Sequence, residues 1–99
     1  MNKTEACEII TVELAKYRNW PYDQLRALVD APKRSFEVVG ASGTRYYVDI
    51  NAHWDDNPEG PVRVLGCIDD GGWRAYLPMT DSFIKAPDGS FVGEESNSP

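Results

Sequence analysis

Segment 34–54, RSFEVVGASGTRYYVDINAHW, decides the fold, because apolar and polar residues alternate on both sides of one short turn. Before the turn, Phe36 and Val38 flank Glu37. After the turn, the apolar phase continues in Tyr46, Val48, Ile50, Ala52 and Trp54. A period of two is typical of a strand with one buried face. Ala41-Ser42-Gly43 suits a three-residue hairpin loop with a left-handed glycine, so we expect Val38 opposite Tyr46 and Phe36 opposite Val48.

Two later segments repeat the alternation. Their apolar positions are Val62, Val64 and Ile68, then Trp73, Ala75, Leu77 and Met79. Asp70-Gly71 suits a two-residue turn between them, which would pair Ile68 with Trp73 and Val64 with Leu77. Segment 81–93 is expected to form a hairpin strand or an irregular crossing around Pro87-Asp88-Gly89. Alternatively, Thr80-Asp81-Ser82 could cap a helical turn.

The first third of the chain has helical spacing. Cys7, Ile10, Leu14 and Tyr17 recur every three or four residues, and Thr4 could cap this first helix. A second helix is expected after Pro21, with Tyr22, Leu25, Leu28 and Val29 on one face, ending at Ala31-Pro32. The predicted fold is therefore α+β, with two N-terminal helices packed on one face of a mainly meander antiparallel sheet of four to five strands.

The length and net charge of the chain limit the possible domain organisation and ligands. The 99 residues fit one domain over 1–93, followed by a flexible acidic tail over 94–99. The net charge is −6, and the excess lies after residue 34, where four basic residues face eleven acidic ones. This surface would repel nucleic acid. The sequence also lacks the apolar run of about 20 residues that a membrane helix needs, and the two cysteines suggest free thiols in a cytoplasmic protein.

Two Asp-Asp pairs raise the question of a metal site. Asp55-Asp56 and Asp69-Asp70 follow successive strands, so they should lie roughly 20–25 Å apart, at opposite ends of the sheet. Metal ligands must converge on one ion, so we interpret both pairs as turn residues and expect no metal and no cofactor. Weak cation binding by Asp55, Asp56, Glu59 and Asp81 stays open as an alternative.

The single histidine is not expected to form a catalytic pair. His53 should lie opposite Arg63, and Cys67 opposite Asp49, which separates His53 from Cys67 by about 13 Å. This distance is too long for a nucleophile–base hydrogen bond. We assign no catalytic residue, and a small hydrolase using Asp49, His53 or Cys67 remains the enzyme alternative.

The outer face of the sheet is the candidate interaction face. Tyrosine and arginine surround a small uncharged strip there, a composition typical of protein interfaces; an ordinary solvated face is the alternative. The residues expected on it are Arg45, Tyr47, Asp49, His53, Arg63, Leu65, Cys67, Arg74 and Tyr76. The sequence therefore favours a non-catalytic module that binds a protein partner or forms a homodimer. Because the chain is small and acidic, an immunity-type inhibitor of a basic toxin is a second interpretation.

The C-terminal third resembles a family of small uncharacterised bacterial proteins. The likeness rests on the runs DDGGWRA, TDSFI and APDGSFVGE, with a weaker one in WPYDQLRALVD. This resemblance implies a bacterial, cytoplasmic domain to which no activity is assigned. It carries no catalytic residue over to this chain.

Overall fold

The computed structural model describes residues 2–72 and 78–94, which begin with two helices. Helix α1 spans Lys3–Arg18 and helix α2 spans Tyr22–Val29. The predicted cap at Thr4 is wrong: the Asn2 side chain caps α1 by accepting a hydrogen bond from the Glu5 N–H at 3.0 Å. Asparagine is a stronger N-cap than threonine, so cap preference favours the position that the structure shows.

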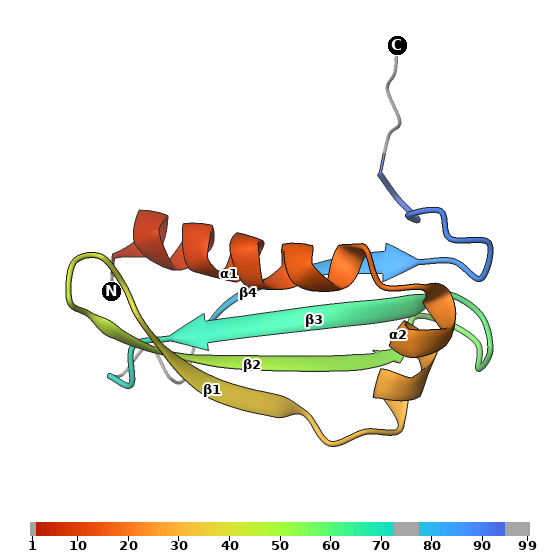
Figure 1. Cartoon of the computed structure of the whole chain (residues 1–99), viewed down its shortest axis with the longest axis horizontal. Helices are drawn as coiled ribbons and strands as arrows, with labels where there is room; N and C mark the ends of the chain where they lie inside the picture. Colours follow the sequence, from red (N-terminus) through yellow and green to blue (C-terminus); the bar gives the residue numbers. More distant parts are fainter. Residues whose placement is uncertain (1, 73–77, 95–99) are drawn as a thin grey trace, which may run out of the picture.

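Four strands follow the helices and form one antiparallel sheet in the order β1-β2-β3-β4 (Figure 1). They span Arg34–Val39 (β1), Arg45–Trp54 (β2), Val62–Asp69 (β3) and Met79–Lys85 (β4). Both helices pack on the same face of the sheet: α1 lies over β3 and β4, and α2 lies over β2 and β3. The predicted α+β fold with a meander sheet is confirmed.

The hairpin of β1 and β2 has the predicted register. Phe36 pairs with Val48, and Val38 pairs with Tyr46. Gly43 in the connecting loop has a φ of 89°, the left-handed conformation that favours glycine. Turn chemistry and side-chain alternation therefore identify the same hairpin.

The predicted register of the last strand is wrong. Val64 pairs with Phe83 instead of Leu77, and Ile68 pairs with Met79. Proline cannot donate a ladder hydrogen bond, and β4 begins directly after Pro78, which the prediction had placed inside the strand. Because the strand moves by an even number of residues, its apolar phase keeps the predicted face. Of the predicted strand, 73–77 lie outside the described residues.

The segment after β4 turns back on itself. Thr80, Asp81 and Ser82 belong to β4, so the alternative of a helical turn there is wrong. Lys85 then forms an isolated bridge with Phe91 across a tight turn. The Arg18 guanidinium holds the end of this return, because it binds Glu94 through two hydrogen bonds of 2.7 and 3.1 Å. The predicted tail begins at Glu94, but 95–99 lie outside the described residues, so the tail stays a prediction.

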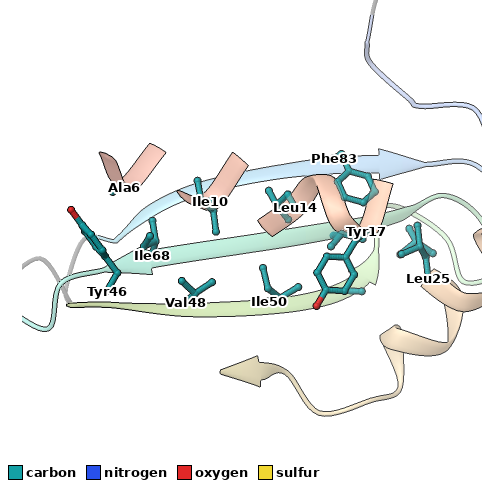
Figure 2. Close-up of a cluster of buried hydrophobic side chains, with 13 residues drawn as sticks. Ala6, Ile10, Leu14, Tyr17, Leu25, Tyr46, Val48, Ile50, Ile68 and Phe83 are labelled. Atoms are coloured by element: carbon teal, nitrogen blue, oxygen red, sulfur yellow. The ribbon is translucent and has the colours of Figure 1, made fainter. Parts of the chain in front are cut away.

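The core lies between the helices and the inner face of the sheet (Figure 2). Along α1 it contains Ala6, Ile10, Leu14 and Tyr17, which are 0–7% exposed. From the sheet it contains Tyr46, Val48, Ile50, Ala52, Val62, Val64, Ile68 and Phe83. A Cβ on Gly66 would come within 2.7 Å of the Ile10 side chain, so this glycine allows α1 to approach β3.

Cys7 does not join the core, which corrects the predicted helix face. The buried stripe runs through Ala6, four residues before Ile10, and Cys7 lies one residue further round the helix and is exposed. Both spacings, Ala6 to Ile10 and Cys7 to Ile10, fit a helical period, so periodicity alone does not separate the two residues. Cys7 and Cys67 are both free thiols.

Polar contacts tie both ends of α1 to the sheet. Near its N-terminus, the Glu5 carboxylate accepts hydrogen bonds from the hydroxyl and N–H of Ser42 and from the Tyr46 hydroxyl, at 2.6–2.9 Å. These bonds, from Ser42 first, hold the pKa of Glu5 below its usual value of 4.5. Beyond its C-terminus, the buried Lys85 ammonium donates to two backbone carbonyls, those of Arg18 and Trp20, at 2.8 and 2.9 Å.

In the part of the chain that the structure describes, neither helix has the length and apolar content needed to cross a bilayer.

Candidate functional site

The candidate site is the face of the sheet opposite the helices, which we call the open face. Alternation along β2 and β3 fixes its members, because each neighbour of a buried core residue points the other way. Its described residues on β2 and β3 are Arg45, Tyr47, Asp49, Asn51, His53, Arg63, Leu65, Cys67 and Asp69. Seven of the nine predicted face residues are among them; Arg74 and Tyr76 lie outside the described residues.

Short polar contacts hold the β1 side of the open face. The Ser35 hydroxyl donates to the Asp49 carboxylate at 2.6 Å, and the Lys33 ammonium lies 3.6 Å from the same group. Arg45 pairs with Glu37 on the neighbouring strand at 3.4 Å. The Lys33 and Arg45 pairs join exposed groups, so each contributes little to stability. They do orient the side chains of this region.

The opposite end is organised by Arg63. Its guanidinium donates to the Asp55 carboxylate at 2.9 Å and to the Ser82 hydroxyl at 2.9 Å, which links three successive parts of the sheet. His53 lies directly across from Arg63 in the β2–β3 register and is exposed. The sequence placed His53 and Arg63 together but gave no sign of Ser82, because the register of β4 was wrong.

The open face is nearly neutral although the protein is acidic. Among its described residues and their ion-pair partners, three basic groups face four acidic ones: Lys33, Arg45 and Arg63 against Glu37, Asp49, Asp55 and Asp69. Most of the net charge of −6 therefore lies on other surfaces.

The centre of the face contains a polar atom without a partner. Asn51 lies opposite Leu65, which in turn lies opposite Ser82 on β4. Among the described residues, the buried Asn51 Oδ1 accepts no hydrogen bond. An unpaired buried oxygen costs free energy, but this atom is covered by the protein's own atoms and is not offered to a binding partner.

A shallow hollow of about 300 Å³ borders this centre on the β1 side. Ser35, Glu37, Tyr47 and Asp49 line it from the open face. The Tyr47 side chain is 41% exposed, and its ring covers Gly71, where an added Cβ would come within 2.7 Å of the ring. The hollow thus presents an aromatic edge next to a carboxylate.

The geometry gives no support to catalysis by Asp49, His53 and Cys67. Cys67 pairs with Asp49 and His53 with Arg63, so four residues of strand separate the thiol from the imidazole. Burial, and after it the Asp49 carboxylate, raises the pKa of the Cys67 thiol. A nucleophilic cysteine needs the opposite shift, because the thiolate is the reactive form.

The paired aspartates organise turns. Asp69 and Asp70 accept hydrogen bonds from the N–H groups of Gly71 and Gly72, two residues further on in each case, at 2.7 and 3.1 Å. Such contacts are the usual reason for aspartate in turns. Asp55, at the other end of β3, is bound by Arg63.

The looser acidic cluster considered from the sequence does not converge. Asp81 lies in the middle of β4 opposite Gly66, away from the loop that carries Asp55, Asp56 and Glu59. The Glu59 carboxylate is paired with Arg26 at 2.6 Å. In the stretches 2–72 and 78–94, no three His, Cys, Asp or Glu side chains come together to hold an ion.

No family model, curated protein or solved structure matches this chain. The resemblance of its C-terminal third to small bacterial proteins therefore stays a prediction.

Proposed function

We propose that the protein is a non-catalytic module that binds a partner protein through the open face. The observation that carries this proposal is the uncharged, half-buried centre formed by Asn51 and Leu65 on a face whose described charges are largely paired. Interface centres are typically apolar and aromatic with few unpaired charges, and a polar rim surrounds them.

The paired charges favour binding for a second reason. Arg63 and Asp49 are already held by neighbouring side chains, so a partner would not have to order them. Less side-chain ordering on association leaves more of the contact energy as affinity. A face that binds no partner would gain no affinity from side chains that are already ordered.

Leu65→Asp tests the proposal. Leu65 is half-buried on the open face, so the change should cost about 1–2 kcal/mol and leave the chain folded, while an added charge at the centre should abolish partner capture. The matched control is Thr11→Asp, which adds the same charge on the exposed side of α1.

The readout is capture of proteins from a lysate of the source cells, followed by titration of the purified partner. We expect binding by the wild-type protein and by Thr11→Asp, and loss of binding with Leu65→Asp. Equal binding by all three proteins, or loss with Thr11→Asp alone, would place the interaction elsewhere.

An immunity-type inhibitor of a basic toxin is the second candidate. It is favoured by the concentration of negative charge away from the open face, including the exposed Asp56. This candidate predicts that Asp56→Lys and added salt weaken binding to a basic protein, whereas Leu65→Asp leaves it unchanged.

The proposal includes a cytoplasmic location, because both cysteines are free thiols. Thiol titration of the unfolded protein without reductant should find two reactive groups. A monomer without reactive thiols would instead indicate an oxidising compartment.

A further inference from the structure

The two helices leave one strand of the sheet uncovered. Helix α1 lies over β3 and β4 and α2 lies over β2 and β3, whereas neither helix lies over β1 at the edge of the sheet (Figure 1). On the helix side of β1, Phe36 and Val38 pack against the core but are only half-buried. The fold therefore leaves apolar surface exposed between α1 and β1.

Two contacts join α1 to the first hairpin and leave an opening between them. Near the start of α1, the Glu5 carboxylate accepts hydrogen bonds from Ser42 in the β1–β2 loop. Near its end, the Arg34 guanidinium of β1 lies 5.7 Å from the centre of the Tyr17 ring. The helix between Glu5 and Tyr17 is about 18 Å long, which corresponds to roughly three turns.

Within this opening lies a hollow of about 230 Å³, which we call the α1–β1 groove. It is lined by Ile9, Val12 and Val38 and by two acidic residues of α1, Glu8 and Glu13. Val12 is 59% exposed, more than any other large apolar side chain of the two helices. A single exposed apolar residue is ordinary on a protein surface, but here it borders a hollow that is itself largely apolar.

The acidic residues beside the groove are only partly neutralised within the chain. Glu8 is exposed and, among the described residues, has no ion-pair partner. Glu5, one turn before Ile9, is bonded to neutral groups alone and so keeps its negative charge. Glu13 is paired with Lys16 at 3.0 Å. A ligand that complements the groove therefore combines apolar side chains with positive charge.

We propose that the α1–β1 groove binds a basic amphipathic helix of a partner protein. Such a helix repeats its apolar side chains every three or four residues, so an opening of roughly three turns accepts two or three of them. Lysine or arginine beside this apolar stripe would face Glu5 and Glu8. The bound helix would lie next to α1, on the opposite side of the sheet from the open face, so this inference does not depend on the proposed function.

Other ligands complement the groove less well. Nucleic acid would bring phosphate groups next to Glu5 and Glu8, and like charges repel. A second copy of this chain carries the same net charge of −6, which opposes self-association at an acidic site. A basic helix from a different protein meets neither obstacle.

The probe is a synthetic amphipathic peptide of leucine, lysine and alanine, with about 18 residues so that it can form a helix. Titration of the isotope-labelled full chain with this peptide should shift the amide signals of Ile9, Val12 and Val38. Added salt should weaken the binding, because it screens exposed charges. A scrambled peptide of the same composition and a peptide with glutamate in place of lysine should each bind about tenfold more weakly or not at all.

Substitutions at exposed positions of α1 locate the bound peptide. Val12→Lys removes an apolar contact and adds a repelling charge, so the affinity should fall about tenfold or more. Glu8→Lys should lower the affinity several-fold. The matched control is Thr11→Lys, which adds the same charge as Val12→Lys at an exposed residue outside the groove and should bind the peptide nearly as wild type does. Thermal unfolding confirms that each variant is folded.

Three results would overturn the inference: no binding of the basic peptide, equal binding of the scrambled peptide, or equal losses of affinity with Val12→Lys and Thr11→Lys. Signal shifts confined to Tyr47, Leu65 and Cys67 would also overturn it and would place the peptide on the open face. Leu65→Asp separates the two sites, because it should leave peptide binding at the groove unchanged. Failure of the groove would therefore leave the proposed function standing.

Discussion

The two faces of the sheet fix their side chains in different ways. Under the helices, Val48, Ile50 and Val64 are at most 1% exposed and are held by close packing. On the open face, Asp49 and Arg63 are held by polar contacts of 2.6–3.6 Å near solvent. The covered face should therefore respond strongly to changes in volume, and the open face should tolerate them while its binding properties change.

Truncation of Ile10 should give the largest effect. Ile10→Ala removes a side chain that is 1% exposed and leaves a cavity above β3, so we expect a loss of about 2–5 kcal/mol. Leu65→Ala on the open face should cost about 1 kcal/mol or less. Urea unfolding of both variants measures the contrast, and equal losses would show that the two faces are packed alike.

Adding one methyl group beneath α1 should have the next largest effect. In Gly66→Ala, the new Cβ would lie within 2.7 Å of Ile10, so α1 or the Ile10 side chain must shift, at about 1–3 kcal/mol. Gly72→Ala is the matched control, because the nearest contact is the Asp70 carboxylate at 3.4 Å. A neutral Gly66→Ala would mean that the helix is not closely seated on β3.

Replacing the buried Lys85 compares the contribution of a polar contact under the helices with that of one on the surface. Lys85→Met keeps the length of the side chain but leaves the carbonyls of Arg18 and Trp20 without this donor, so we expect a loss of about 1–3 kcal/mol. Lys16→Met, which changes a 61% exposed side chain, should cost about 0.5 kcal/mol or less. Thermal unfolding of both variants tests whether polar contacts contribute more under the helices than on the surface.

The sequence predicts the β1–β2 hairpin well because two independent signals agree there. The alternation of Phe36 and Val38 with Glu37 and the glycine of the loop both require one register. For the last strand, the Asp70-Gly71 turn and the alternation also agreed, but on a wrong register, because alternation is unchanged by any even shift of the strand. Pro78 was the signal that would have placed the start of β4.

The candidate site is predictable only in part, because some of its contacts depend on the register of β4. The faces of Asp49, His53, Leu65 and Cys67 follow from alternation along β2 and β3. The contact of Arg63 with Ser82 depends on the β4 register. Lys85 also could not be found, because its partners are the backbone carbonyls at the end of α1, which have no side-chain pattern.

The smallest effect concerns the polar contact between α1 and the β1–β2 loop. The folded state holds the pKa of Glu5 below 4.5 through Ser42 and Tyr46, so the folded protein binds fewer protons here than the unfolded chain does. The stabilisation is therefore complete above pH 4.5 and is lost as the pH falls through the lowered pKa. Glu5→Gln should be less stable than wild type at neutral pH, and the difference should shrink in acid.

Urea unfolding of wild type and Glu5→Gln between neutral pH and a pH of about 2 measures this difference. Glu8→Gln, on an exposed position of the same helix, is the control for loss of one charge. A constant difference between wild type and Glu5→Gln over the whole range would contradict the expectation. It would mean that Ser42 and Tyr46 bind the protonated carboxyl as well as the carboxylate. The stabilisation by this contact would then be independent of charge, like the close packing on the covered face.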